Sequence, residues 1–101
     1  MTIPEAVHLI GIGGTGLSAI ARVLLERGCR VSGSDRLLSP LAERLQADGV
    51  RILIGHQPGN VLGADLVVRS SATKLTRRTW NTCVGGGRPA LIVVPPRRVI
   101  R

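Results

Sequence analysis

Four of the six residues from position 11 to position 16 are glycine, in the order Gly11-Ile12-Gly13-Gly14-Thr15-Gly16. A glycine string of this spacing can hold a phosphate when it joins a strand to a helix, because backbone N–H groups then face the anion. Gly11 would allow the tight reversal, and Gly16 would let the helix pack closely on the strand. Gly13 or Gly14 would let the backbone approach a phosphate without a Cβ in the way. We therefore expect a site for the diphosphate of a nucleotide, although such a turn can also serve only as a tight connection.

Several polar side chains could extend this site. Asp35 follows Gly16 by 19 residues, where nicotinamide-binding domains place an acid that accepts from ribose hydroxyls. It could also be a loop acid that helps to cap a turn. Thr15 and Ser18 could add hydroxyl donors, and His56 could donate to a base carbonyl or a phosphate, or be an ordinary surface residue. These residues alone do not separate a dinucleotide from another nucleoside diphosphate.

Alternating aliphatic and amphipathic stretches would position these residues. An apolar run over residues 6–10 indicates a buried strand, and apolar residues at helical spacing between positions 17 and 25 indicate an amphipathic helix. Ser39 as N-cap and Pro40 after it would begin a second helix. Further strands are expected over residues 30–35, 50–54 and 65–70, and residues 90–94 could add a fifth. This alternation predicts an α/β fold with an open parallel sheet of four to five strands, Rossmann-like and three-layered, with its ligand site at the carboxyl ends of the strands.

The positive charge of the chain is concentrated in its last third. The formal net charge is +8, yet all six acidic residues lie before residue 74 and seven basic residues lie after residue 73. We expect a domain over residues 1–73 and a divergent basic tail over residues 74–101. The composition of the tail could result from a shifted reading frame or from a degraded or truncated gene. It could also be a genuine divergent tail or, least favoured, a basic arm that contacts phosphate-rich partners. Trp80 is the only aromatic residue, so the stacking platforms of single-strand nucleic-acid readers are missing and no nucleic-acid partner is expected.

The two cysteines and the apolar runs set further expectations. Cys29 and Cys83 lack metal-ligand spacing, so neither a disulfide framework nor a metal site is expected. Cys29 should be a small packing residue and His8 a hydrogen-bonded core residue. The sequence shows no secretory signal and no apolar run long enough to cross a membrane. We therefore expect a cytoplasmic protein without a membrane partner, and its oligomeric state stays open.

Residues 7–73 resemble the N-terminal domain of the Mur ligases, in particular the members that add alanine. The resemblance is carried, in one register, by His8-Leu-Ile-Gly-Ile-Gly-Gly-Thr-Gly-Leu-Ser18, Val31-Ser-Gly-Ser-Asp35, Gly55-His56 followed by Asn60, Gly63-Ala-Asp-Leu-Val-Val68 and Ser70-Ser71-Ala72. After Ala72 the chain departs from the family pattern, which continues with an Asn-Pro-Glu helix start and a Gly-Ile-Pro-Val-like strand.

The resemblance implies a ligand and a set of site residues. In that family the domain binds the UDP part of UDP-N-acetylmuramate rather than NAD, with the glycine turn on the diphosphate. The UDP-sugar-binding residues implied here are Gly11, Gly13, Gly14, Thr15, Gly16, Ser18, Ser34, Asp35, His56, Ser70, Ser71 and Ala72.

The resemblance also implies which chemistry this fragment lacks. The family's ligases use ATP and Mg²⁺ to activate a carboxylate as an acyl phosphate, which the amine of the amino acid attacks. The chain has no Gly-x-x-x-x-Gly-Lys-[Ser/Thr] string, and Lys74 is its only lysine. We expect no catalytic residue, and neither ATP nor Mg²⁺ bound, in this fragment of an acid–amino-acid ligase of peptidoglycan biosynthesis. A fragment of the murein-tripeptide recycling ligase, or an NAD(P)-binding domain of an oxidoreductase or regulator, is the alternative.

Overall fold

The predicted order of strands and helices is present in the computed structural model, which describes residues 5–55, 63–70 and 90–94. The elements are β1 (Ala6–Ile10), α1 (Thr15–Glu26), β2 (Arg30–Asp35), α2 (Pro40–Ala47), β3 (Arg51–Ile54), β4 (Leu66–Ser70) and β5 (Ala90–Val94). The expected bounds of the strands are matched except at the starts of β3 and β4, each of which begins one residue later than expected. The α/β fold class and the fifth strand are confirmed.

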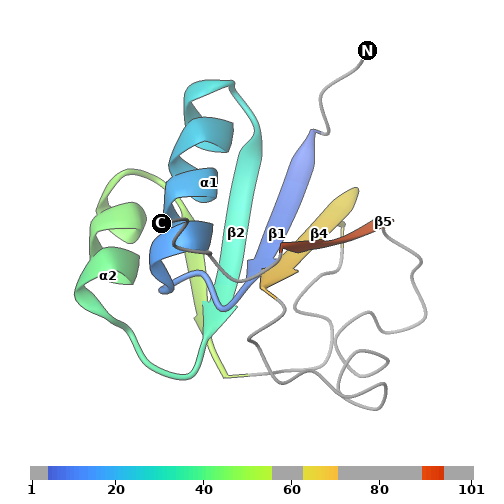
Figure 1. Ribbon diagram of the computed structural model, residues 1–101. Helices are drawn as coiled ribbons and strands as arrows, with labels where there is room; N and C mark the ends of the chain where they lie inside the picture. The colour runs from blue at the N-terminus through green and yellow to red at the C-terminus, as the bar shows by residue number, and fades with distance from the viewer. Residues whose placement is uncertain (1–4, 56–62, 71–89, 95–101) are drawn as a thin grey trace, which may run out of the picture.

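All five strands are parallel and lie in the order β3-β2-β1-β4-β5 (Figure 1). The chain first moves outward from β1 through β2 to β3 and then returns to the other side of β1 with β4. Val7 of β1 is therefore paired with Val31 of β2 on one side and with Leu66 of β4 on the other. The strand order reverses between β1 and β4, and open α/β sheets bind ligands beyond the carboxyl ends of the strands at such a point.

Helices α1 and α2 lie together against the face of the sheet that carries the main apolar core (Figure 1). Val7 and Leu9 of β1 pack there with Leu17 and Ala21 of α1 and with Leu45 of α2. The described residues contain no helix on the opposite face, so the second helical layer of the expected three-layer arrangement would fall outside them. No helix among the described residues is long and apolar enough to cross a membrane.

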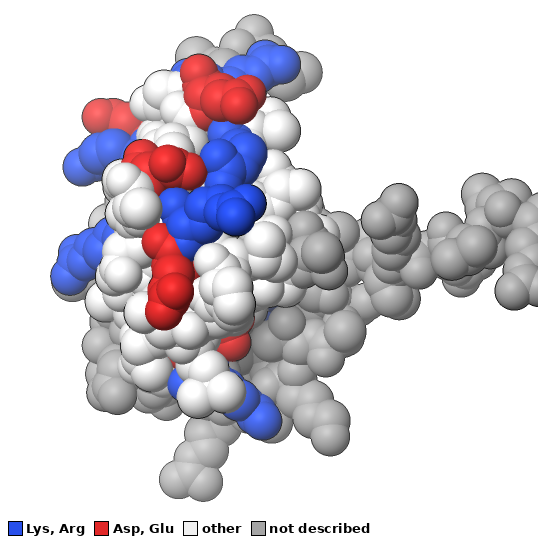
Figure 2. Space-filling view, turned by 90° about the vertical axis from the view of Figure 1, so that its left-hand side faces the viewer, with Lys and Arg blue, Asp and Glu red and all other residues white. Residues whose placement is uncertain are grey.

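The outer surface of the two helices carries charges of both signs. Figure 2 shows acidic and basic side chains interspersed over this side of the molecule. Arg22 of α1 forms an ion pair with Asp48, just after α2, with 3.0 Å between Nη1 and Oδ2. Both side chains are nearly half exposed, so this pair contributes little to stability. This side of the fold is therefore not a one-sign patch of the kind that attracts nucleic-acid phosphates.

The glycine turn crosses closely over β2. Gly11 adopts φ +83°, which glycine tolerates without strain, and the turn then places the fully buried Ile12 directly against Gly33. A Cβ on Gly33 would lie 2.6 Å from Cβ of Ile12. A Cβ on Gly16 would meet no atom within 4 Å. The role expected for Gly16 in close packing is wrong, and Gly33, which the sequence did not single out, has it instead.

This contact predicts coupling between Gly33 and Ile12. Gly33→Ala should lower the free energy of unfolding by about 1–3 kcal/mol, because the new methyl group overlaps the Ile12 side chain. In an Ile12→Ala background, the same substitution should have a smaller effect, since the obstructing atoms are gone. Urea unfolding followed by circular dichroism measures all four proteins. Gly16→Ala is the control, expected to leave stability unchanged or to raise it by up to about 1 kcal/mol. An equal loss for Gly33→Ala in both backgrounds would contradict the contact.

Candidate functional site

The residues expected to bind a nucleotide come from three neighbouring strand ends. The glycine turn follows β1, Asp35 ends β2 and Ser70 ends β4. The register pairs Ile10 of β1 with Ser34 and with Arg69, so these three ends lie at one edge of the sheet. Of the other expected site residues, His56, Ser71 and Ala72 lie outside the described residues, as do the side chains of Thr15 and Ser70.

Backbone hydrogen bonds fix the shape of the glycine turn. The amides of Gly11 and Ile12 both donate to the carbonyl oxygen of Ser34, at 2.7 and 3.2 Å. The amide of Gly14 donates to the carbonyl oxygen of Gly11 at 3.0 Å. These three amides therefore already have protein acceptors, and they hold the turn against the end of β2.

Asp35 supplies an acceptor for the amide of Gly13, which completes the hydrogen bonding of the amides from Gly11 to Gly14. Its Oδ2 accepts from the amide of Gly13 at 2.8 Å, and its Oδ1 accepts from the amide of Arg36 at 2.7 Å. A Cβ on Gly13 would lie 2.6 Å from Oδ2 of Asp35 and 2.6 Å from Oγ of Ser39. The absence of a side chain at Gly13 therefore makes room for these two groups, whereas we had expected it to make room for a phosphate.

Helix α1 begins with amides that no side chain caps. Its N-cap is Gly14, which offers no side-chain acceptor, and its first turn contains no acidic residue. The amide of Ser18 donates to the Gly14 carbonyl at 2.8 Å. The amides of Thr15, Gly16 and Leu17, one turn earlier, have no acceptor within the helix. Together with the positive end of the helix dipole, they form a place where an anion is stabilised.

Helix α2 begins at the same edge of the sheet, and its first turn is capped, unlike that of α1. Oγ of Ser39 accepts from the amide of Ala42 at 3.2 Å, as the sequence predicts for an N-cap. Pro40 has no amide hydrogen to satisfy, and Glu43 places a negative charge in the first turn. Of the two described helices, α1 is therefore the one whose start lacks both a cap and a negative charge.

Two serines of the expected site are buried. Ser34 is 1% exposed and Ser18 is 8% exposed. Oγ of Ser34 lies 3.3 Å from Nε2 of His8 on the sheet face opposite the helices. In the structure, Ser34 reaches the proposed site through its carbonyl oxygen, which holds the turn, rather than through its hydroxyl.

His8 is the buried, hydrogen-bonded core residue that the sequence predicted. It has no exposed surface, and its Nδ1 lies 2.8 Å from Oγ of Ser32. Burial away from water, together with the positive charge of Arg51, lowers the pKa of His8 from 6.5 to about 4. A neutral imidazole between two serine hydroxyls is a structural polar group, since it carries no charge for a ligand at neutral pH. Cys29 is likewise buried and packs in the core, as expected.

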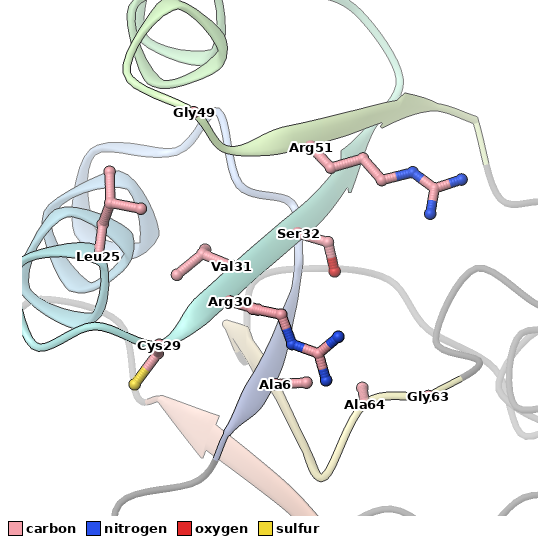
Figure 3. Close-up of a pocket in the computed structure, with 10 residues that line it drawn as sticks. All are labelled: Ala6, Leu25, Cys29, Arg30, Val31, Ser32, Gly49, Arg51, Gly63 and Ala64. Carbon is pink, nitrogen blue, oxygen red and sulfur yellow. The ribbon is translucent and has the colours of Figure 1, made fainter.

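A cavity of about 500 Å³ lies at the opposite, amino edge of the strands (Figure 3). Arg30 and Arg51 line it, but two acids are close by. Nη2 of Arg30 lies 3.9 Å from Oε1 of Glu5, and Oδ2 of Asp65 accepts from the amide of Ala6 at 3.0 Å. The charges at this edge therefore balance, and the cavity is separate from the glycine turn by the length of the strands. It is not the anion site that the sequence predicted.

A model of the Mur ligase family, described as its catalytic domain, matches residues 6–99. The chain belongs to the Mur ligase family. The match crosses residue 73, where a domain boundary was predicted. The boundary, and the shifted reading frame proposed for the residues after it, stay predictions that the coding DNA would test.

Individual members of the Mur ligase family resemble the chain over most of its length. It is 52% identical over 69 residues to the UDP-N-acetylmuramate–L-alanine ligase of Solibacter usitatus, a match that covers 68% of the chain and 15% of that protein. The same ligase of Burkholderia mallei is 42% identical over 98 residues, covering 97% of the chain and 20% of that protein. The chain thus spans about a fifth or less of the length of these curated relatives.

Solved structures of Mur ligases have the same fold. The UDP-N-acetylmuramate–alanine ligase of Thermotoga maritima superposes with a TM-score of 0.66 at 30% identity, over 71% of this chain and 16% of that one. A UDP-N-acetylmuramate:L-alanyl-γ-D-glutamyl-meso-diaminopimelate ligase from Neisseria meningitides superposes with a TM-score of 0.74 at 26% identity, over 90% of this chain and 29% of that one. These likenesses confirm the Rossmann-like fold of this Mur ligase chain.

The lowered pKa of His8 predicts how stability changes with pH. The unfolded chain takes up a proton at this residue near pH 6.5, whereas the folded chain does so only near pH 4. The free energy of unfolding should therefore fall as the pH drops from 6.5 to 4, by up to about 3 kcal/mol from this group, and no further below. In His8→Gln, which keeps hydrogen-bonding atoms but does not titrate, this part of the loss should disappear. Urea unfolding at several pH values compares the two proteins, and parallel pH profiles would contradict the assignment.

Proposed function

We propose that this chain binds the UDP part of UDP-N-acetylmuramate and belongs to an ATP-dependent ligase that joins UDP-N-acetylmuramate to L-alanine in peptidoglycan biosynthesis. The observation that carries the proposal is the uncapped start of α1 behind the glycine turn, at the point where the strand order reverses. The relatives from Solibacter usitatus and Burkholderia mallei, both UDP-N-acetylmuramate–L-alanine ligases, support the choice of ligand.

In this proposal the ligand spans the carboxyl edge of the sheet. The diphosphate accepts hydrogen bonds from the amides of Thr15, Gly16 and Leu17, assisted by the dipole of α1. The uridine lies toward the end of β2, near Asp35. The resemblance to the Mur ligases adds His56, Ser70, Ser71 and Ala72 to the residues proposed to bind the ligand. The chain binds and orients the nucleotide sugar and contributes no group to the bond-forming step.

In this proposal, ATP and Mg²⁺ are bound by other parts of such a ligase. When bound there, ATP with Mg²⁺ would supply the phosphoryl group that activates the substrate carboxylate, with ADP as the leaving group. Nothing in the described residues fits that role, since they contain no lysine and no cluster of three or more acidic, histidine or cysteine side chains that could hold a metal. We therefore propose that the described residues bind neither and contribute no catalytic group.

A second candidate is a ligase that recycles murein peptides. It is favoured by one specific observation, the higher TM-score of the Neisseria ligase, whose acceptor is a peptide. Both candidates act on UDP-N-acetylmuramate, and they differ in the acceptor.

Calorimetric titration tests the choice of nucleotide. UDP-N-acetylmuramate and UDP should each bind the 101-residue chain, and NADH should bind more weakly or not at all. NADH binding tighter than either UDP ligand would overturn the proposal in favour of an NAD(P)-binding domain.

The start of α1 can be tested with a charge at Gly16, where a side chain meets no atom within 4 Å. Gly16→Asp should weaken UDP binding by about 1 kcal/mol more than Gly16→Asn does, because a carboxylate in the first turn repels a diphosphate. The stability of Gly16→Asp should be unchanged or higher, since an acid at a helix start is favourable. Calorimetry at low and high salt measures the affinities. Equal affinities of the two variants would mean that the diphosphate lies elsewhere.

A further inference from the structure

We propose that Asp35 is a positioning residue that controls the diphosphate half of the site by holding Gly13, and that it does not act on the nucleoside half alone. The contact itself stands on the geometry of the ligand-free chain. Its effect on binding rests on the function proposed above.

The carboxylate of Asp35 is fixed at both oxygens by backbone amides. Oδ2 accepts from Gly13 at 2.8 Å, and Oδ1 accepts from Arg36 at 2.7 Å. The backbone around it is fixed as well, because the carbonyl of Asp35 accepts from the amide of Gly55 at 2.7 Å. An aspartate held at both carboxylate oxygens and at its backbone carbonyl is a rigid acceptor, and hydrogen bonds to a charged group are among the stronger ones in proteins.

Gly13 is the residue of the turn that this acceptor controls. The residues on its N-terminal side, Gly11 and Ile12, are held by the carbonyl of Ser34. The residue on its C-terminal side, Gly14, is the N-cap of α1. The bond from Gly13 to Asp35 therefore fixes the backbone just before the helix whose first amides would face the diphosphate.

The space around Gly13 supports the same assignment. Asp35 Oδ2 and Ser39 Oγ would each lie 2.6 Å from a Cβ at this position. The close neighbours of Gly13 are thus an acid at the end of β2 and the N-cap residue of α2. The turn therefore lies against the end of β2 and the start of α2. Loss of the carboxylate would free the turn to move, and the amides of Thr15, Gly16 and Leu17 would lose their fixed direction.

Binding of two ligands separates positioning from direct contact with the nucleoside. Asp35→Ala should weaken binding of UDP and of inorganic pyrophosphate by a similar factor, about tenfold, because both need the ordered turn. Asp35→Asn keeps an oxygen that can accept from Gly13, so its loss should be clearly smaller for both ligands. Asp48→Ala removes an acid of the same kind that pairs with Arg22 outside the site, and it should leave both affinities unchanged.

Hydrogen exchange of the Gly13 amide, measured by NMR without ligand, tests the contact by itself. Exchange should be at least about tenfold faster in Asp35→Ala, intermediate in Asp35→Asn and unchanged in Asp48→Ala, provided that the global stability of each variant is measured alongside. Unchanged Gly13 exchange in Asp35→Ala would overturn the contact. A loss of UDP affinity with unchanged pyrophosphate affinity would overturn its effect on the diphosphate half. If the parent chain binds neither ligand, the proposed function fails, and the Gly13 exchange still decides the contact.

Discussion

The crossing of the glycine turn over the end of β2 is the constraint on which the rest of this structure depends. The carbonyl of Ser34 accepts two hydrogen bonds from the turn, and Ile12 is packed where Gly33 has no side chain. This crossing sets where α1 begins and in which direction it runs. Without it, the first-turn amides of α1 would not be aimed at the carboxyl edge of the sheet, and the apolar stripe of the helix would not meet β1 and β2.

The composition of β2 follows from the same constraint. Its residues Arg30–Asp35 include a glycine and four polar side chains, although it lies between β1 and β3 inside the sheet. Gly33 is needed under Ile12, while Ser32 and Ser34 are satisfied by the two nitrogens of His8 on the other face. A buried polar group is tolerated when its hydrogen bonds are made. The polar residues of β2 therefore support the turn and the face behind it, and do not mark an exposed edge strand.

The sequence predicted the elements of the fold well, since strands and helices leave local signals. Aliphatic runs, helical spacing and the pair Ser39-Pro40 depend only on neighbouring residues, and the structure confirms the elements they indicate. The reasons for individual glycines were harder to predict. Gly33 and Gly13 are required by contacts with Ile12 and Asp35, each about twenty residues away, and such contacts depend on the register of β1 against β2. That register is set by the packing of the whole sheet, so spacing within the turn suggested a reason for Gly16 that the structure does not support.

The glycine turn lies at the edge of the sheet where the sequence predicts the site, but its amides are bonded differently from what we expected. The amides of Gly11 to Gly14 are all bonded to the protein, so the glycine string shapes the turn and the amides left for an anion belong to α1. A helix start with glycine as N-cap is less stable than one capped by serine, by about a few tenths of a kcal/mol. Helix α2 begins at the same edge of the sheet, and its start, where no ligand is proposed, is capped by Ser39 and carries the negative charge of Glu43. A bound diphosphate would complete α1 as Ser39 and Glu43 complete α2, so ligand binding and the stability of the first helix would be coupled.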